Sequence, residues 1–201
     1  MNHRRQFLLW LGAAGLAACD KPSAPSSSKP VFYGVDITGA DYGRKLDLPD
    51  IDGKPRSLAD FRGKVCAIFF GFTHCPDVCP TAMTELAQIK HDLGAEGKRI
   101  QGVFITVDPE RDTPQVLKEY MASFDPSFVA LRGTQEQTSA AAKEFKAFYA
   151  KAEGKEAGSY TMEHTAGYYL IDPQGRLRLF VRYGTPTQEL LSDLKQLLSA
   201  T

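Results

Sequence analysis

The chain has 201 residues, of which 43% are hydrophobic and 24% are charged, a composition typical of a globular domain that is large enough to bury one continuous core. Lysine and arginine together number 24, as do aspartate and glutamate. Because the net charge is zero, the composition excludes the basic excess that draws proteins to nucleic acid.

The first residues resemble the export signal of a bacterial lipoprotein. Arg4 and Arg5 precede an apolar run from Phe7 to Ala18, whose 12 residues fall short of the roughly 20 that a membrane-spanning helix needs. The run leads into "LAAC", which ends at Cys19 and resembles a lipobox, where such proteins are cleaved and acylated. We therefore expect residues 1–18 to be a signal peptide and a lipid on Cys19 to hold the protein at the periplasmic face of the inner membrane.

The segment "RRQFL" within this signal also resembles a twin-arginine signal, so export by that route or by the ordinary Sec route stays open.

A tether follows the signal. Residues 19–30 end in "DKPSAPSSSKP", whose prolines and serines without apolar periodicity predict a flexible linker. We expect one folded domain over residues 31–201.

The first predicted elements lie between residues 46 and 72. The turn signals "DG" and "RG" within "LDLPDIDGKPRSLADFRGK" predict a strand, a turn and a short helix. The following "VCAIFFGF", from Val65 to Phe72, is a continuous apolar run, as expected for a strand in a sheet that is covered on both faces. Cys66 lies in this run, and we expect it to be a buried thiol that packs as a small hydrophobe.

Helices and strands then alternate to the end of the chain. Apolar residues at helical spacing, with Pro80 in the first helical position, predict a helix over residues 80–94. The other predicted elements are a strand at 102–107, a helix at 113–124, a strand at 128–131, a helix at 134–149, a polar insertion at 151–160, strands at 165–171 and 177–183, and a helix at 187–199. This order predicts an α/β fold with a central mixed sheet flanked by helices.

The two cysteines best placed for redox or metal chemistry lie in one loop. "THCPDVCP" places three residues between Cys75 and Cys79 and a proline after each. Because a residue before proline avoids the helical region, we predict a loop from Cys75 to Cys79 and a helix that begins at Pro80. Both sulfurs then lie near a helix N-terminus, where unpaired N–H groups favour thiolates. Such sulfurs can form a disulfide, exchange with other thiols or bind a soft metal.

The spacing narrows these possibilities only in part. A thioredoxin motif has two residues between its cysteines, whereas this chain has three. A peroxiredoxin needs a threonine three residues before its reactive cysteine, whereas Thr73 lies two before Cys75. A metal site needs a third ligand, for which the chain offers His74, His91 and His164 besides its methionines.

The three histidines differ in their surroundings. His91 lies among polar neighbours late in the predicted helix, which is typical of a solvated surface side chain. His74 adjoins Cys75 and could tune the pKa of its thiol. His164 opens the predicted strand "HTAGYYLI" after the polar insertion, a position from which its imidazole could reach the cysteines.

Three stretches resemble motifs of the Sco/SenC family, the membrane-tethered thioredoxin-like proteins involved in assembling the copper centre of cytochrome c oxidase. They are "FFGFTHCPDVCP", "TVDPERDTP" and "EHTAGYYLIDPQGRL", which follow one another in the family's order. The resemblance covers essentially the whole domain and implies a thioredoxin-like fold with an N-terminal extension. In this family two loop cysteines and a distant histidine bind copper, which implies Cys75, Cys79 and His164 as the ligands here.

The chemistry of that ligand set agrees with copper. Two thiolates and one imidazole suit three-coordinate Cu(I) and can hold Cu(II), whereas zinc would accept the same ligands but want a fourth. Glu163 stands where the family commonly has aspartate, and Met162 could offer a thioether or pack in the core. Asp108 and Asp112 predict a turn and a helix cap that support the site. Asp77 could stabilise a bound cation or lie in solvent at the loop tip.

The sequence therefore favours a copper metallochaperone that passes copper to the cysteine ligands of an oxidase subunit. The alternative is a thiol:disulfide oxidoreductase that reduces those cysteines, with Cys75 and Cys79 as its catalytic pair, and the two roles can coexist. A permanent structural disulfide between the same cysteines is a third interpretation, so whether the chain is an enzyme stays open. The implied partners are the copper-bearing oxidase subunit or another copper protein, and the membrane surface through Cys19.

Overall fold

A computed structural model describes residues 31–154 and 158–199. The predicted signal peptide, the predicted lipid attachment at Cys19 and the tether lie outside the described residues. Within the described part of the chain, every helix is too short or too polar to cross a membrane.

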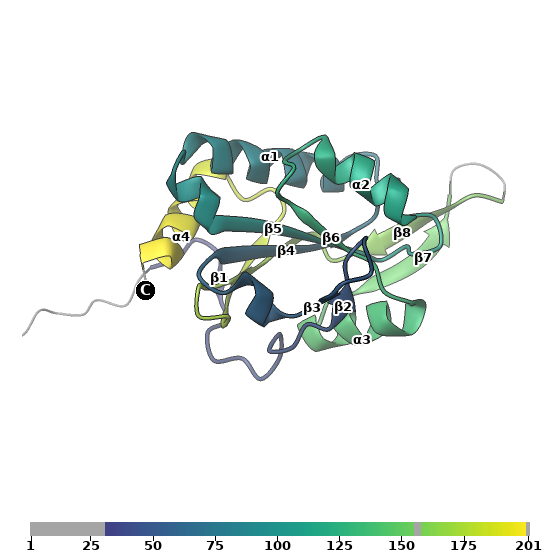
Figure 1. Cartoon of the computed structure of the whole chain (residues 1–201), viewed down its shortest axis with the longest axis horizontal. Coiled ribbons are helices and arrows are strands. Elements are labelled where there is room, and N and C mark those ends of the chain that lie inside the picture. Colours follow the sequence, from purple (N-terminus) through teal and green to yellow (C-terminus); the bar gives the residue numbers. More distant parts are fainter. Residues whose placement is uncertain (1–30, 155–157, 200–201) are drawn as a thin grey trace, which may run out of the picture. The chain divides into compact units, whose positions relative to one another are not determined.

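The described domain is built on a six-stranded sheet with the strand order β1-β10-β9-β4-β5-β6 (Figure 1). Strands β4, β5 and β6 run parallel to one another, whereas β9 is antiparallel to both β4 and β10, and β10 is antiparallel to β1. The sheet is therefore mixed, as the sequence predicts. Its strands are β1 (Val35–Asp36), β4 (Val65–Gly71), β5 (Ile100–Thr106), β6 (Val129–Leu131), β9 (Gly167–Ile171) and β10 (Leu177–Arg182).

Helices cover both faces of this sheet. In Figure 1 helices α1 and α2 lie above the edge-on sheet and α3 lies below it. The side chains agree, because Phe104 of β5 packs on Tyr120 of α2 while Phe70 of β4 packs on Phe145 of α3. The helices are α1 (Val78–Asp92), α2 (Pro114–Ala122), α3 (Gln135–Phe145) and α4 (Thr187–Ser199).

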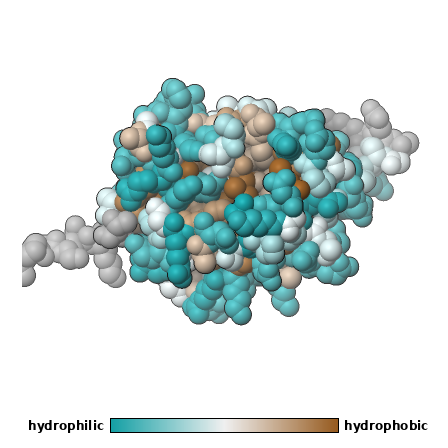
Figure 2. All heavy atoms as spheres, viewed as in Figure 1, coloured by the Kyte–Doolittle hydropathy of each residue, from teal (hydrophilic) through white to brown (hydrophobic). Residues whose placement is uncertain are grey.

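The core follows directly from the apolar runs. All seven residues of β4 and all seven of β5 are buried, because helices cover the sheet on both sides. Alternate residues face opposite sides, so Phe69 contacts Tyr168 on one face (ring centroids 5.5 Å apart) and Phe70 contacts Tyr169 on the other (6.0 Å). Hydrophilic side chains cover most of the surface in Figure 2, and apolar ones gather near its middle. The expected burial of Cys66 is confirmed by its 1% exposure.

The segment before β4 matches the prediction of a strand, a turn and a short helix. Strands β2 (Leu48–Pro49) and β3 (Pro55–Arg56) pair as a small antiparallel sheet, and the 3-10 helix η1 (Leu58–Phe61) follows. A second 3-10 helix, η2 (Glu96–Arg99), leads directly into β5. As a result β5 begins at residue 100 rather than at the predicted residue 102.

The prediction for residues 134–164 is wrong in two respects. Helix α3 ends at Phe145 because Lys146 adopts a left-handed conformation with φ of 53°, a common way for a helix to end. The next residues form strand β7 (Tyr149–Glu153), which pairs antiparallel with β8 (Tyr160–His164). The predicted polar insertion is therefore partly a β-hairpin, and His164 ends β8 instead of opening the next strand.

Candidate metal centre

Cys79 lies inside the first turn of helix α1. The prediction of a loop up to Cys79 is wrong, because α1 begins at Val78 rather than at Pro80. The first N–H groups of a helix have no intrahelical acceptor, so proline as the third helical residue costs no hydrogen bond. Cys79 therefore adopts helical backbone although a residue before proline usually avoids it. The backbone N–H of Cys79 instead points at Cys75, with 3.4 Å between nitrogen and Sγ.

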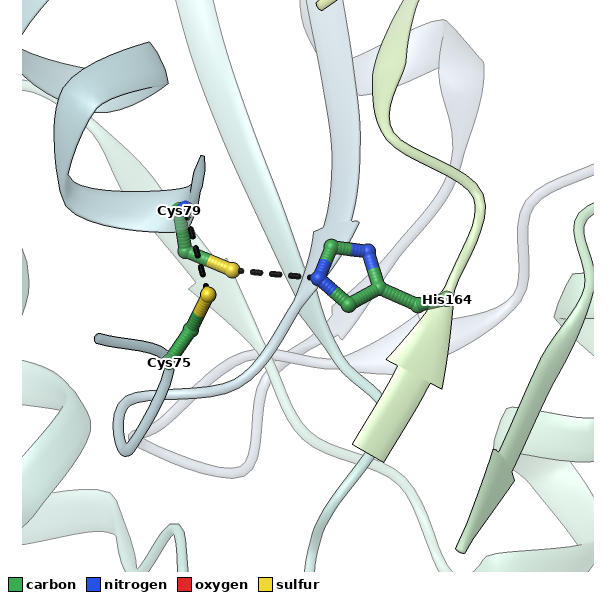
Figure 3. A group of neighbouring side chains, drawn as sticks. All are labelled: Cys75, Cys79 and His164. Carbon is green, nitrogen blue, oxygen red and sulfur yellow. Dashed lines mark hydrogen bonds between the residues drawn. The ribbon is translucent and has the colours of Figure 1, made fainter. Parts of the chain in front are cut away.

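Two neighbouring cysteines and a histidine from a distant part of the sequence meet at this helix end (Figure 3). Cys75 comes from the loop after β4, Cys79 from α1 and His164 from the end of β8. The Sγ atom of Cys79 lies 3.4 Å from Nε2 of His164, and all three candidate ligand atoms lie within 4.8 Å of one another. The fold thus brings together the cysteines and the histidine that the sequence predicts as ligands.

The orientation of the His164 ring is fixed by its neighbours. Its Nδ1 lies 3.1 Å from the backbone oxygen of Thr165, and since a carbonyl only accepts, this nitrogen carries the proton. Phe69 and Phe72 meet the imidazole edge to face, each with 5.9 Å between ring centroids. With Nδ1 directed at this carbonyl, Nε2 points toward the sulfurs, and it is the nitrogen that binds a metal when it carries no proton.

The two thiols differ strongly in acidity. A hydrogen bond from the Cys79 thiol, helped by His164 and by backbone N–H groups, outweighs partial burial and lowers the pKa of Cys75 to about 3. The same hydrogen bond, together with burial, raises the pKa of Cys79 well above its usual value. These shifts favour a thiolate at half-buried Cys75 beside a thiol at buried Cys79, and both cysteines are free in the structure.

This asymmetry predicts a distinctive pattern of alkylation. Because the pKa of Cys75 is lowered to about 3, its reaction with iodoacetamide should stay nearly constant from about pH 5 to pH 8, whereas an ordinary thiol of pKa about 8.5 slows roughly tenfold per pH unit. Mass spectrometry of the reduced, metal-free protein measures the rate at each cysteine. Buried Cys66, whose pKa burial raises, is the internal control and should stay unmodified. A Cys75 rate that falls tenfold per unit would contradict the assigned thiolate.

The other candidate ligands point elsewhere. The Nδ1 atom of His74 lies 3.8 Å from a carboxylate oxygen of Asp112 and outside the three-residue cluster. His91 has a side chain that is 86% exposed, which confirms the prediction of a surface histidine. Met162 is 6% exposed within the core, so its thioether packs, and Glu163 is exposed on the opposite side of β8.

Asp112 holds the start of the cysteine loop by hydrogen bonds. Its buried carboxylate accepts hydrogen bonds from the hydroxyl of Thr73 (2.6 Å), the backbone N–H of Thr73 (3.1 Å) and the hydroxyl of Thr106 (2.5 Å). The prediction of a helix cap is wrong for this residue, because Thr113 caps α2 by accepting from Val116 N. Asp112 turns inward instead and ties the residues before Cys75 to the end of β5.

Asp108 and Asp77 have different surroundings. Asp108 is 1% exposed, pairs with Arg111 and accepts a 2.9 Å hydrogen bond from the Tyr160 hydroxyl. The sequence predicts only a turn here and does not predict these buried contacts of Asp108. Asp77 is exposed and precedes α1 as its N-cap residue, and its carboxylate lies 3.4 Å from the Thr81 hydroxyl. It is thus at the solvated tip of the loop.

Gly71 leaves the space that the Cys79 sulfur occupies. A Cβ atom at residue 71 would lie 2.8 Å from Cys79 Sγ and 2.9 Å from the Phe104 ring, which is closer than such atoms approach. Gly71→Ala should therefore displace the sulfur, lower the affinity of the cluster for a metal by about tenfold or more, and destabilise the fold by about 1–3 kcal/mol. The measurements are a metal competition titration and denaturant unfolding.

Gly102→Ala is the matched control for that variant. A Cβ atom there would lie 2.6 Å from the Phe128 ring, so the crowding is similar but lies away from the sulfurs. We expect a comparable loss of stability with unchanged metal affinity. Equal metal affinity in the two variants would show that the space at Gly71 has no bearing on the site.

Comparison with known proteins identifies a family. Residues 35–199 match the model of the SCO1/SenC family. The SCO2-like protein of Rickettsia felis is 36% identical over 176 residues, which are 86% of this chain and 86% of that protein. The family model therefore covers nearly the whole described domain and includes all three residues of the cluster.

Solved structures carry the same fold. Copper-bound ScoI of Bradyrhizobium japonicum is 37% identical with a TM-score of 0.68, over 76% of this chain and 97% of that one. A SCO1/SenC family lipoprotein from Bacillus anthracis is 28% identical with a TM-score of 0.64, over 76% and 92%. BsSco, described as a cytochrome c oxidase assembly protein with a disulfide switch, is 25% identical with a TM-score of 0.61, over 84% and 98%. The fold is thioredoxin-like, as the sequence resemblance implies.

Proposed function

The chain belongs to the SCO1/SenC family, and on that premise we propose that it is a copper metallochaperone for the copper centre of cytochrome c oxidase. The observation that carries the proposal is the cluster of Cys75, Cys79 and His164, whose ligand atoms lie within 4.8 Å of one another. We further propose that these three residues are the copper ligands. Copper is the cargo in this account and is bound only until it is transferred.

The donor set fits copper better than its competitors. Two sulfurs and one imidazole nitrogen are soft and intermediate donors, which suit Cu(I) and also hold Cu(II), whereas magnesium and calcium prefer oxygen. A structural zinc site takes four ligands. Among the residues that the structure describes, the cluster of cysteine, histidine and acidic side chains has three members, which supports copper over zinc.

The exposure of the sulfurs supports transfer by ligand exchange. Cys79 is fully buried, whereas Cys75 is partly exposed. A thiolate of the acceptor protein can therefore reach the copper beside Cys75 and coordinate it. The ligands of this chain then dissociate from the copper one after another. The oxidation state of the copper does not change in this exchange. The Cys79 thiol releases its proton when copper binds, because the thiolate is the ligand.

A copper titration tests this function. The reduced protein should bind about one copper per chain at micromolar concentration, and oxidation to Cu(II) should produce a sulfur-to-copper charge-transfer band. Cys66→Ala is the matched control, because it removes a buried thiol outside the cluster and should bind as the wild type does. The absence of binding at micromolar copper would contradict the proposal.

The sulfur pair also favours a second function, thiol:disulfide exchange. The Cys75 thiolate can attack a disulfide of the partner and form a mixed disulfide. Cys79 then attacks Cys75 as it loses its proton, which releases the partner's second thiol and leaves a Cys75–Cys79 disulfide. The disulfide of BsSco makes such a reaction reasonable in this family. The reduced pair binds copper and the oxidised pair cannot, so the two functions are compatible.

We also propose a lipid anchor at Cys19. The family includes a lipoprotein from Bacillus anthracis, and "LAAC" ends at Cys19 in this chain. One lipidated cysteine carrying more than one acyl chain would hold the domain at the outer face of the inner membrane. Membrane fractionation tests this, since Cys19→Ala should move the protein out of the membrane fraction, and its retention there would overturn the anchor.

A further inference from the structure

The two halves of the metal cluster belong to different parts of the fold. Cys75 and Cys79 sit on the loop and helix that follow β4 of the six-stranded sheet, whereas His164 ends β8. Among the described strands, β8 pairs only with β7. A two-stranded hairpin is marginally stable by itself, so contacts elsewhere must fix the distance between imidazole and sulfurs.

One short segment, Asp108–Asp112, contacts both halves. At one end Asp112 accepts the backbone N–H and the hydroxyl of Thr73, two residues before Cys75. At the other end Asp108 accepts the hydroxyl of Tyr160 at 2.9 Å. Tyr160 is the first residue of β8 and His164 is its last. The segment thus lies between the cysteine loop and the strand that carries the histidine.

Arg111 makes a stacked and hydrogen-bonded contact between this segment and Tyr160 of the hairpin. The guanidinium carbon lies 3.7 Å from the centre of the tyrosine ring, and Nη1 donates a 2.9 Å hydrogen bond to the backbone oxygen of Tyr160. Asp108 pairs with the same guanidinium and keeps it in place. We call these three residues the clasp.

The clasp also reaches the histidine through a second aromatic ring. Arg111 lies 5.8 Å from the centre of the Phe72 ring, and Phe72 meets His164 at an interplanar angle of 84°. The guanidinium therefore packs between the start of β8 and a ring that contacts the imidazole. A stacked and hydrogen-bonded guanidinium restricts the motion of both neighbours.

We propose that Arg111 and Tyr160 are positioning residues that hold His164 at the sulfurs and so set the contribution of its imidazole to copper binding. The inference rests on the proposed copper function and identifies which residues outside the ligands control it. If the clasp is lost, His164 occupies the binding position for a smaller fraction of the time. The apparent affinity then falls by that fraction, and we expect a loss of about 10- to 100-fold, as for other outer contacts of metal ligands.

A double-mutant cycle with copper affinity as readout tests the proposal. Tyr160→Leu removes both the ring stack and the hydroxyl and should lower Cu(II) affinity by about 10- to 100-fold, with a changed charge-transfer spectrum. In the His164→Ala background the same substitution should have no further effect, because no imidazole remains to be positioned. Tyr160→Phe keeps the stacked ring and should restore most of the affinity.

The matched control alters an exposed ion pair outside the clasp. Glu96 pairs with Arg99 at 3.0 Å, with side chains 58% and 36% exposed, so Glu96→Gln should leave copper affinity within about twofold. An equal loss of affinity from Tyr160→Leu with and without His164 would overturn the proposal, as would no loss at all. If Tyr160→Leu does not fold, Arg111→Gln enters the same cycle.

A metal-free measurement separates this inference from the proposed function. In Tyr160→Leu the backbone amides of β8 should exchange hydrogen faster than in the wild type, while the amides of β4 and β5 stay protected. If the wild type binds no copper, the copper function fails, but this exchange pattern still tests the clasp. Unchanged exchange in β8 would show that the clasp does not restrain the hairpin.

Discussion

Replacing His164 with alanine is expected to lower copper affinity by about 100-fold or more while thiol exchange persists. The imidazole supplies the one nitrogen of the proposed site, with Nε2 at 3.4 Å from Cys79 Sγ. Loss of a ligand should exceed the roughly 10- to 100-fold effect of losing an outer contact. The thiolate of Cys75 stays available for exchange, because its acidity depends first on Cys79. Competition with a copper chelator and reduction of a small disulfide measure the two activities.

His74→Ala is the control for this variant. Its side chain is 53% exposed and faces Asp112, so both copper affinity and thiol exchange should stay near those of the wild type. Full copper affinity in His164→Ala would contradict the assigned site. Loss of both activities in His164→Ala, with the fold intact, would show that the histidine is needed for the chemistry of the sulfurs themselves.

Replacing Asp112 with alanine should affect both stability and copper binding. The buried carboxylate accepts three hydrogen bonds from Thr73 and Thr106 at 3.1 Å or less, and its removal leaves those donors unpaired. Such losses typically destabilise a protein by about 3 kcal/mol or more. The loop that carries Cys75 then loses its attachment to β5, so copper affinity should fall by about 10- to 100-fold. Urea unfolding and a copper competition assay measure the two effects.

Asp41→Ala is the control for Asp112→Ala. Asp41 forms an exposed ion pair with Lys146 at 3.5 Å, and its side chain is 86% exposed. Removing it should change the free energy of unfolding by less than about 0.5 kcal/mol. A similarly small change in Asp112→Ala would mean that the cysteine loop is held by contacts other than this carboxylate.

The sequence predicts the sheet well because its central strands are read from composition alone. The apolar run of β4 is buried on both faces, so no partner needs to be known to recognise it. The β7–β8 hairpin is different, since its sequence is largely polar and β8 buries only Met162. Its pairing depends on contacts such as that of Tyr160 with Arg111, which join residues 49 positions apart. No local pattern contains that information.

The candidate site could be predicted only in part for the same reason. The cysteines stand out by their spacing, but the start of α1 depends on how a helix tolerates Pro80 in its first turn. His164 is favoured only by resemblance to a family, because a lone histidine beside a polar segment gives no local signal. Asp112 is of a residue type that often caps helices. It is a buried acceptor here only because β4 and β5 bring Thr73 and Thr106 to it.

The most direct test of the account is X-ray absorption spectroscopy of the reduced wild-type protein loaded with one equivalent of Cu(I). The cluster of Cys75, Cys79 and His164 should give a copper ion with two sulfur neighbours and one nitrogen neighbour. The nitrogen contribution should disappear in His164→Ala. A wild-type spectrum with only sulfur neighbours, or with none, would contradict the proposed centre.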